Sequence, residues 1–133
     1  MRLDRVSGVL TTGLRSLREC HHFPVCYVVA HSMGGLVSRT AITDAVKDEG
    51  SDFLLNIYAT PLPKGTVHHL IYGAIEKGPF SLKGENDGVV TVVSETDLRV
   101  KESTTSFRHL LHEHTEILQK QETLDWVLEL LKK

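Results

Sequence analysis

The chain has 133 residues, of which 41% are hydrophobic and 24% are charged, and this balance excludes the composition of a disordered protein. Its length predicts a single domain with one core. The net charge of -2 provides no broad positive field for a phosphate backbone, so we expect no nucleic-acid partner. No apolar run approaches the roughly 18 to 20 residues that cross a bilayer, so we also expect no transmembrane segment.

The chain contains two cysteines, Cys20 and Cys26, and it opens without a charged, apolar and small-residue signal segment. This pattern predicts free thiols and a cytoplasmic location. Cys26 lies inside an apolar run and is expected to be a small core residue.

The first half of the chain predicts two helices with a strand between them. The β-branched and aromatic content of residues 25–31 predicts a buried strand after Pro24. A second helix is expected from Gly34 to Gly50, a glycine being suited to end a helix. The helix before the strand, over residues 2–20, has an apolar stripe at helical spacing, which consists of Leu3, Val6, Leu10, Leu14 and Leu17.

The second half predicts further strands and a closing helix. Residues 52–60, 66–75 and 89–94 have the composition of buried strands, and 104–111 is a weaker candidate because its alternation is imperfect. Thr115 is a plausible cap for the closing helix, whose apolar stripe consists of Ile117, Leu118, Leu124, Val127, Leu128 and Leu131.

This order of elements predicts an α/β fold with a mostly parallel sheet flanked by helices. Parallel neighbours need crossover connections, which usually contain a helix. No repeat or linker interrupts the pattern, so we expect one domain over residues 1–133. The connection between 52–60 and 66–75 is too short for a helical crossover. Either these strands lie differently from the prediction, or a segment between them has been lost.

The sequence AHSMGG, residues 30–35, places a serine between an expected strand and an expected helix. A serine hydroxyl becomes a strong nucleophile when a nearby base takes its proton and a third group orients that base. A strand-turn-helix elbow exposes such a serine, and the helix start offers N–H groups to a developing oxyanion. Ala30 and Gly34 are the small residues that so sharp a turn favours, and Met33 would donate one oxyanion N–H. The same short pattern also occurs in ordinary strand-to-helix turns.

This elbow resembles that of the α/β-hydrolase superfamily, and within it the lipase-like and GPI inositol-deacylase-like serine hydrolases that carry HSMGG. Two later segments extend the resemblance, NDGVVTVVS at 86–94 and HTEIL at 114–118, where the family places its acid and its histidine. The resemblance implies a triad of Ser32 as nucleophile, Asp87 as acid and His114 as base, in the family's chain order. It also implies ester hydrolysis through an acyl-enzyme on Ser32, with no metal and no organic cofactor.

Other residues compete for the acid and the base. Glu85 and Asp97 match the family's acid segment less well, and an isolated NDG is more typical of a turn. His109 and His112 are alternatives for the base, with His112 as the reserve, and a lone histidine is often a surface or capping residue. The histidines of residues 109–114 lack a His-Glu-x-x-His motif and a carboxylate or cysteine set, so we expect no metal site.

The resemblance covers only the second half of the hydrolase fold, a truncated three-layer sandwich. The loop that donates the second oxyanion N–H in the family lies further upstream, and losing one such donor lowers the rate by about 10²- to 10³-fold. The strand expected at 25–31 would keep an apolar edge, which a homodimer could cover. We therefore expect a serine esterase or lipase acting on a small-molecule or lipid ester. The alternative is a truncated hydrolase module that binds or assembles without catalysis.

Overall fold

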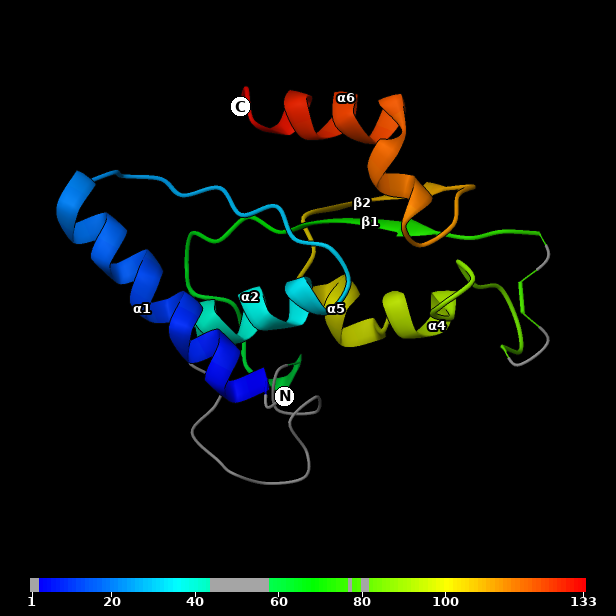
Figure 1. Cartoon of the computed structure of the whole chain (residues 1–133), viewed down its shortest axis with the longest axis horizontal. Coiled ribbons are helices and arrows are strands. Elements are labelled where there is room, and N and C mark those ends of the chain that lie inside the picture. Colours follow the sequence, from blue (N-terminus) through cyan, green and yellow to red (C-terminus); the bar gives the residue numbers. More distant parts are fainter. Residues whose placement is uncertain (1–2, 44–57, 77, 80–81) are drawn as a thin grey trace. The chain divides into compact units, whose positions relative to one another are not determined.

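The computed structural model describes residues 3–43, 58–76, 78–79 and 82–133 (Figure 1). The chain divides into two compact units, Met1–Thr66 and Val67–Lys133. The described residues form helices and a small parallel sheet, so the mixture of helix and strand that the sequence predicts is present.

Two helices that pack against each other make up most of the described part of the first unit. They are α1 (Leu3–His21) and α2 (Met33–Thr43), and the Thr11 hydroxyl of α1 donates to the Ala41 carbonyl oxygen of α2 at 3.2 Å. The predicted first helix is therefore confirmed. The second helix is confirmed as far as Thr43, and its predicted continuation over 44–50 lies outside the described residues.

Residues 25–31 do not form the buried strand that the sequence predicts. They have no regular secondary structure, and Val25, Tyr27 and Val29 are 59%, 59% and 71% exposed. Cys26 is exposed as well, so its prediction as a core residue is wrong. A strand needs a neighbouring chain to satisfy its backbone N–H and C=O groups, and no strand pairs with this segment in the part of the chain that is described. The composition of residues 25–31 indicated a buried strand, but composition does not show whether a second strand is present to pair with it.

The strand predicted at 52–60 lies mostly outside the described residues. Tyr58 to Thr60 are described and are not in a strand. Arg39 of α2 holds this segment, because its guanidinium lies over the Tyr58 ring at 5.9 Å from the centroid and donates to the Thr60 carbonyl oxygen at 3.3 Å.

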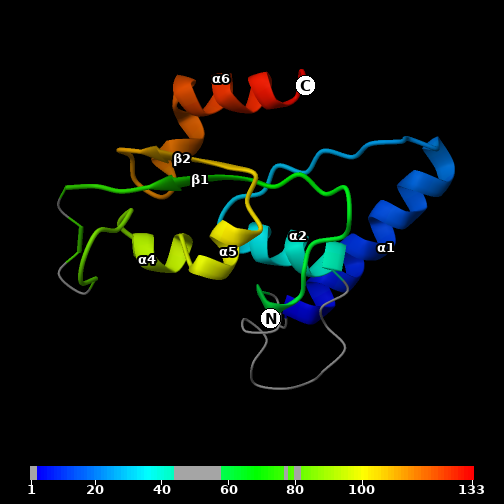
Figure 2. The same ribbon diagram turned by 180° about the vertical axis from the view of Figure 1, so that it is seen from behind.

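The second unit contains a two-stranded parallel sheet of β1 (His69–Gly73) and β2 (Ser106–Leu110), seen side by side in Figures 1 and 2. The strands expected at 66–75 and 104–111 are confirmed. A crossover that contains helices joins them, as a parallel pair requires. The described sheet has two strands, so a hydrolase-like three-layer sandwich is not formed by the described residues.

Two short helices, α4 (Val92–Glu95) and α5 (Leu98–Glu102), lie in the crossover, where the sequence predicts a strand over 89–94. That prediction is wrong because side chains of the segment bond its own backbone. The Thr91 hydroxyl caps α4 by accepting from the Ser94 N–H at 3.4 Å. β-Branched composition alone did not reveal this competition.

The predicted closing helix is divided into η1 (Glu116–Gln119) and α6 (Gln121–Leu130). Lys120 separates them with an extended backbone, at φ -81° and ψ 135°. Thr115 precedes η1 but makes no side-chain cap hydrogen bond, so its predicted role is wrong. The core of this unit is formed by Ala74, Val100, Leu110 and Ile117.

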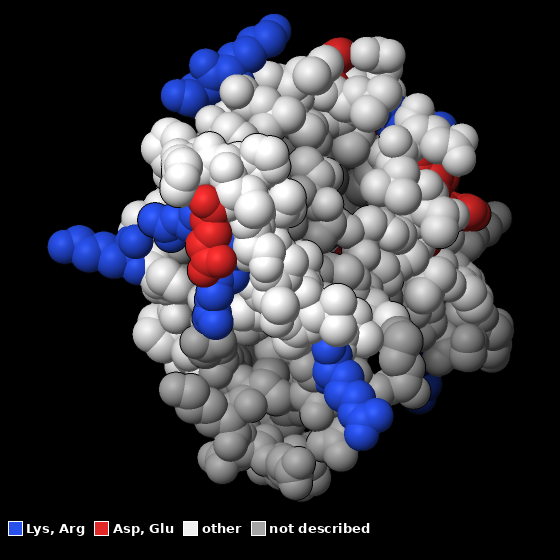
Figure 3. Space-filling model, turned by 60° about the vertical axis from the view of Figure 1, so that its left-hand side comes forward, with Lys and Arg blue, Asp and Glu red and all other residues white. Residues whose placement is uncertain are grey.

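The described helices and surface bear on the expected partners. No described helix is both long and apolar enough to span a bilayer. On the face shown in Figure 3, the described Lys and Arg side chains stand in separate groups among uncharged residues, with acidic side chains beside some of them. This face therefore presents no continuous basic patch among the described residues.

Candidate functional site

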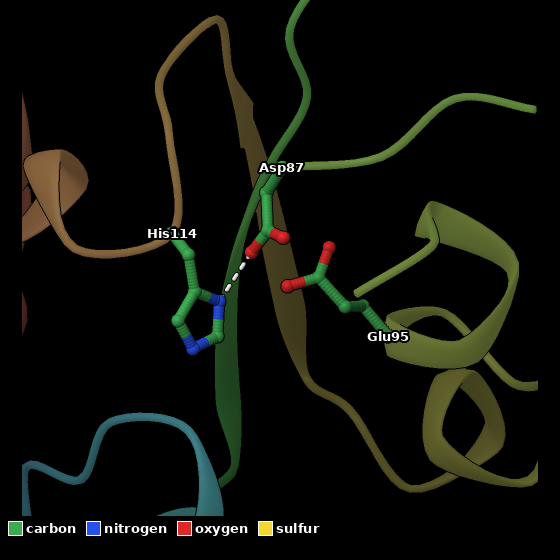
Figure 4. Close-up of side chains that lie close together, drawn as sticks. All are labelled: Asp87, Glu95 and His114. Atoms are coloured by element: carbon green, nitrogen blue, oxygen red, sulfur yellow. Dashed lines mark hydrogen bonds and ion pairs between the residues drawn. The ribbon is translucent and has the colours of Figure 1, made fainter. Parts of the chain in front are cut away.

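Asp87 and His114, two of the residues predicted from the sequence, are hydrogen-bonded to each other within the second unit (Figure 4). The His114 Nδ1–H donates to Asp87 Oδ2, and the His114 backbone N–H donates to the Asp87 carbonyl oxygen at 2.9 Å. The Asp87 side chain is only 2% exposed. Because Nδ1 carries the shared hydrogen, Nε2 of the neutral ring is left as a proton acceptor.

The backbone around Asp87 favours its ionised form. Its Oδ1 accepts from the N–H groups of Val89 and Val90 at 2.9 and 2.7 Å. Burial alone would raise the pKa of Asp87, but these two hydrogen bonds, together with the bond to His114 and its charge, lower the pKa below the ordinary value. The carboxylate is therefore negative at neutral pH and can stabilise a positive imidazole ring.

Asp87 lies in a tight turn that its two neighbours, Asn86 and Gly88, stabilise. The Asn86 side chain accepts from the Gly88 N–H and donates to the Gly84 carbonyl oxygen, each at 2.9 Å. Gly88 has φ of +93°, a conformation that residues with a Cβ rarely adopt. The sequence NDG thus forms a turn and also positions the carboxylate, so its two interpretations do not exclude each other.

Gly73, at the end of β1, lets two segments of the site approach. A Cβ at this position would lie 2.5 Å from the His112 carbonyl oxygen and 3.2 Å from the Asp87 Cβ. Gly73 is not among the site residues predicted from the sequence. A glycine inside a strand pattern is the signal that would have indicated a close backbone approach.

The competing acids and histidines have other surroundings. Glu85 is exposed, and the Asp97 carboxylate caps α5 and pairs with the Arg99 guanidinium at 2.8 Å. His112 Nε2 bonds Glu122 Oε1 at 2.5 Å. His109 is exposed and stacks on the Tyr72 ring, with centroids 5.0 Å apart. Of the acids and histidines weighed above, Asp87 and His114 are the two that bond each other.

Ser32 belongs to the first unit and directly precedes α2. It is exposed and has φ of 55°, the left-handed region that a serine rarely occupies. The Gly34 and Gly35 N–H groups donate to the His31 and Ser32 carbonyl oxygens, each at 2.9 Å. The Met33 N–H has no backbone partner in the described part of the chain, as is usual for the first residues of a helix.

The elbow is less crowded than the small residues on either side of Ser32 suggest. A Cβ at Gly34 would lie 3.9 Å from the Ala30 Cβ, which is ordinary van der Waals contact. An alanine therefore fits at Gly34, and what sets this turn apart is the conformation of Ser32 itself.

The strain at Ser32 has a measurable consequence. Because only a glycine adopts positive φ without steric cost, we expect Ser32→Gly to be about 1 kcal/mol more stable than Ser32→Ala. Both variants lack the hydroxyl, so their difference in free energy of unfolding, measured by urea denaturation, isolates the backbone term. His22, at φ 51° after α1, is the matched position, and His22→Gly should be stabilising relative to His22→Ala. Equal stabilities of Ser32→Gly and Ser32→Ala would show that the elbow is unstrained.

Glu95 of α4 is a third member of the site that the sequence analysis missed. Asp87, Glu95 and His114 each offer one polar atom within 4.8 Å of the others, and Figure 4 shows the Glu95 carboxyl pointing toward Asp87. Burial and the nearby negative charge of Asp87 raise the pKa of Glu95 to about 8. No local motif links Glu95 to Asp87, since the fold of the turn and of α4 brings them together.

Comparisons with models of protein families, with curated proteins and with solved structures return no significant match.

Proposed function

We propose that this chain is a serine hydrolase of the α/β-hydrolase type that cleaves carboxylic esters. The observation that carries the proposal is the Asp87–His114 pair, in which the buried and ionised Asp87 carboxylate holds Nδ1 and leaves Nε2 as the basic atom. The strained conformation of Ser32 at a helix start is a second support, since such strain is concentrated at functional sites. In this proposal β1 and β2 belong to the parallel sheet of a truncated hydrolase-like sandwich.

The reaction would proceed in two steps. His114 Nε2 takes the Ser32 hydroxyl proton while the serine oxygen attacks the ester carbonyl carbon, and the Met33 N–H donates to the resulting oxyanion. The imidazolium, stabilised by Asp87, then protonates the departing alkoxide and leaves an acyl group on Ser32. In the second step His114 takes a proton from water while the water oxygen attacks the acyl carbon. The imidazolium then returns that proton to the Ser32 oxygen as the bond to the acyl carbon breaks, which releases the carboxylic acid and restores the free enzyme. The step sequence involves no metal and no organic cofactor.

Catalysis in this form requires that the Ser32 hydroxyl of the first unit reach His114 Nε2 of the second. The substrate that we propose is a small-molecule or lipid ester in the cytoplasm. An apolar acyl group is proposed because the segment before Ser32 exposes apolar side chains that it could contact. Val28 is 43% exposed and Val29 is 71% exposed.

Turnover of p-nitrophenyl esters of increasing acyl length tests this function. The wild type should hydrolyse them above the rate in buffer, and Ser32→Ala should lose about 10⁴-fold of that activity, because the nucleophile is absent. Circular dichroism of both proteins controls for folding. Equal hydrolysis by the wild type and Ser32→Ala would exclude Ser32 as the nucleophile.

A second candidate function is binding or assembly without catalysis. The observation that favours it is the exposed apolar segment of residues 25–29, which is the kind of surface that pairs with another chain. A homodimer is the form of assembly that we propose for it. Sedimentation velocity of the wild type and of Val29→Lys separates the possibilities, since a dimer through this segment should dissociate in the variant. Such a dimer combined with no ester hydrolysis would favour this second function.

A further inference from the structure

We propose that Glu95 is a positioning residue that, in its protonated form, donates a hydrogen bond to the Asp87 carboxylate and holds it against His114. The role of this chain of three groups in catalysis rests on the proposed function. The chain itself, Glu95 to Asp87 to His114, can be tested without any substrate.

The geometry of Glu95 calls for a hydrogen-bond partner. Its Oε2 is buried and makes no hydrogen bond to the described residues. A buried polar atom without a partner is costly, so native structures rarely retain one. The Asp87 carboxylate lies within the same 4.8 Å cluster, and a proton carried by Glu95 would join the two groups (Figure 4).

The charges decide which carboxyl carries that proton. Two carboxylates this close repel each other, so one of them favours the neutral form. Asp87 accepts from the N–H groups of Val89 and Val90 and from His114, all of which stabilise its negative charge. Glu95 has no comparable donors in the described part of the chain, and the rise of its pKa to about 8 agrees with its holding the proton.

The titratable groups that cluster with Glu95 come from the turn before α4 and from the segment before η1. Asp87 and His114 are the cluster members, and Glu85 of the same turn is exposed. α4 itself, Val92–Glu95, carries no other titratable side chain. Burial and Asp87 therefore govern the Glu95 proton.

The strand β1, which α4 contacts, contributes two more titratable side chains, and both have other partners. His69 Nδ1 bonds the Ser106 hydroxyl at 2.7 Å. The Tyr72 ring stacks on His109. Neither side chain thus replaces Asp87 as the partner of Glu95.

Two carboxylates and an imidazole are also a donor set that divalent metal ions bind. Here His114 Nδ1 and Asp87 Oδ2 bond each other, and Asp87 Oδ1 bonds two N–H groups. A metal ion bound through His114 Nδ1 would displace the His114–Asp87 bond, whereas a proton on Glu95 leaves it intact. The arrangement therefore favours a shared proton, and metal binding becomes an outcome of the test.

The test follows the His114 Nδ1 proton by NMR, since a hydrogen bond to a carboxylate moves its resonance far downfield. In the wild type we expect this resonance at neutral pH and its loss as pH rises through about 8, where Glu95 ionises and repels Asp87. Glu95→Gln, whose amide donates at every pH, should retain the resonance across the range. Glu95→Ala, without a donor, should weaken it at every pH. Glu102→Gln, the same change on the exposed face of α5, should behave as the wild type.

Stability against pH gives a second readout. The folded chain keeps the Glu95 proton up to about pH 8, whereas the unfolded chain releases it near 4.5. The unfolded state therefore binds fewer protons between these values, so this group's contribution to stability falls as pH rises from about 4.5 to about 8 and is constant above. Urea denaturation of Glu95→Gln should lack this fall, and Glu102→Gln should retain it.

Three results would overturn the assignment. One is a transition near pH 8 that persists in Glu95→Gln, and another is a Glu95→Gln resonance as weak as that of Glu95→Ala. The third is stoichiometric Zn²⁺ binding by the wild type that Glu95→Gln abolishes, because the three groups would then form a metal site. Failure of ester hydrolysis with the expected NMR result would instead reject the proposed function and leave the Glu95 assignment standing.

Discussion

Replacing His114 by alanine is expected to lower kcat for ester hydrolysis by about 10⁴-fold while the protein remains folded. The loss follows from removal of the group that takes the Ser32 proton and later activates water. Initial rates with a p-nitrophenyl ester at saturating concentration measure it. KM should change little, since His114 acts on the reacting atoms and not on the acyl chain.

His112→Ala is the matched control, two residues away in the same segment. The His112 side chain bonds Glu122 and lies 3.9 Å from Glu116, so it serves the packing of the C-terminal helices. Its loss should leave kcat within a few-fold of the wild type. If His112→Ala loses activity and His114→Ala retains it, then His112 is the base and the assignment of His114 is wrong.

Asp87→Asn should lower kcat by about 10³- to 10⁴-fold, because an amide in place of the carboxylate favours the wrong tautomer of His114 and cannot stabilise the imidazolium. The side-chain oxygen of asparagine still accepts from the N–H groups of Val89 and Val90, so the turn should persist. Single-turnover kinetics with the ester measures the chemical step directly. Activity within ten-fold of the wild type would show that Asp87 only shapes the turn.

The same variant has a signature in acid. The folded-state pKa of Asp87 lies below its ordinary value, so the carboxylate contributes stability above that value and loses the contribution as pH falls through the folded pKa. Asp87→Asn should therefore lose stability at neutral pH and show a shallower decline in acid than the wild type, both measured by urea denaturation. If the stability of the two proteins declined equally as pH falls, this result would contradict the lowered pKa of Asp87.

The sequence predicted those parts of the fold in which local pattern and final contacts agree. The helix α1 and the strands β1 and β2 are of this kind. Residues 25–31 are not, because a strand depends on a partner elsewhere in the chain and composition carries no information about that partner. The strand predicted at 89–94 is absent for a different reason. The Thr91 hydroxyl and the Asp87 carboxylate accept hydrogen bonds from backbone N–H groups of this segment, in place of a neighbouring strand.

The site residues that could be predicted are those in sequence segments that resemble a known family. The residues that could not be predicted are those that only the fold brings close to the site. Asp87 and His114 were both inferred from segments placed as a resembling family places them, and they bond each other. Glu95 was missed because its closeness to Asp87 arises from a turn followed by a capped helix. Gly73 was missed because a glycine in a strand pattern indicates a close approach but not the segment that approaches, and here a Cβ would lie 2.5 Å from the His112 carbonyl oxygen.

The measurement that tests the proposed hydrolase most directly is covalent labelling with a fluorophosphonate, read by intact mass and by peptide mapping. The folded wild type should acquire one adduct, located on Ser32, and Ser32→Ala should acquire none. His114→Ala should react far more slowly, because the hydroxyl keeps its proton. A folded wild type that takes no label, or an adduct on any residue other than Ser32, would contradict a serine hydrolase built on Ser32, Asp87 and His114.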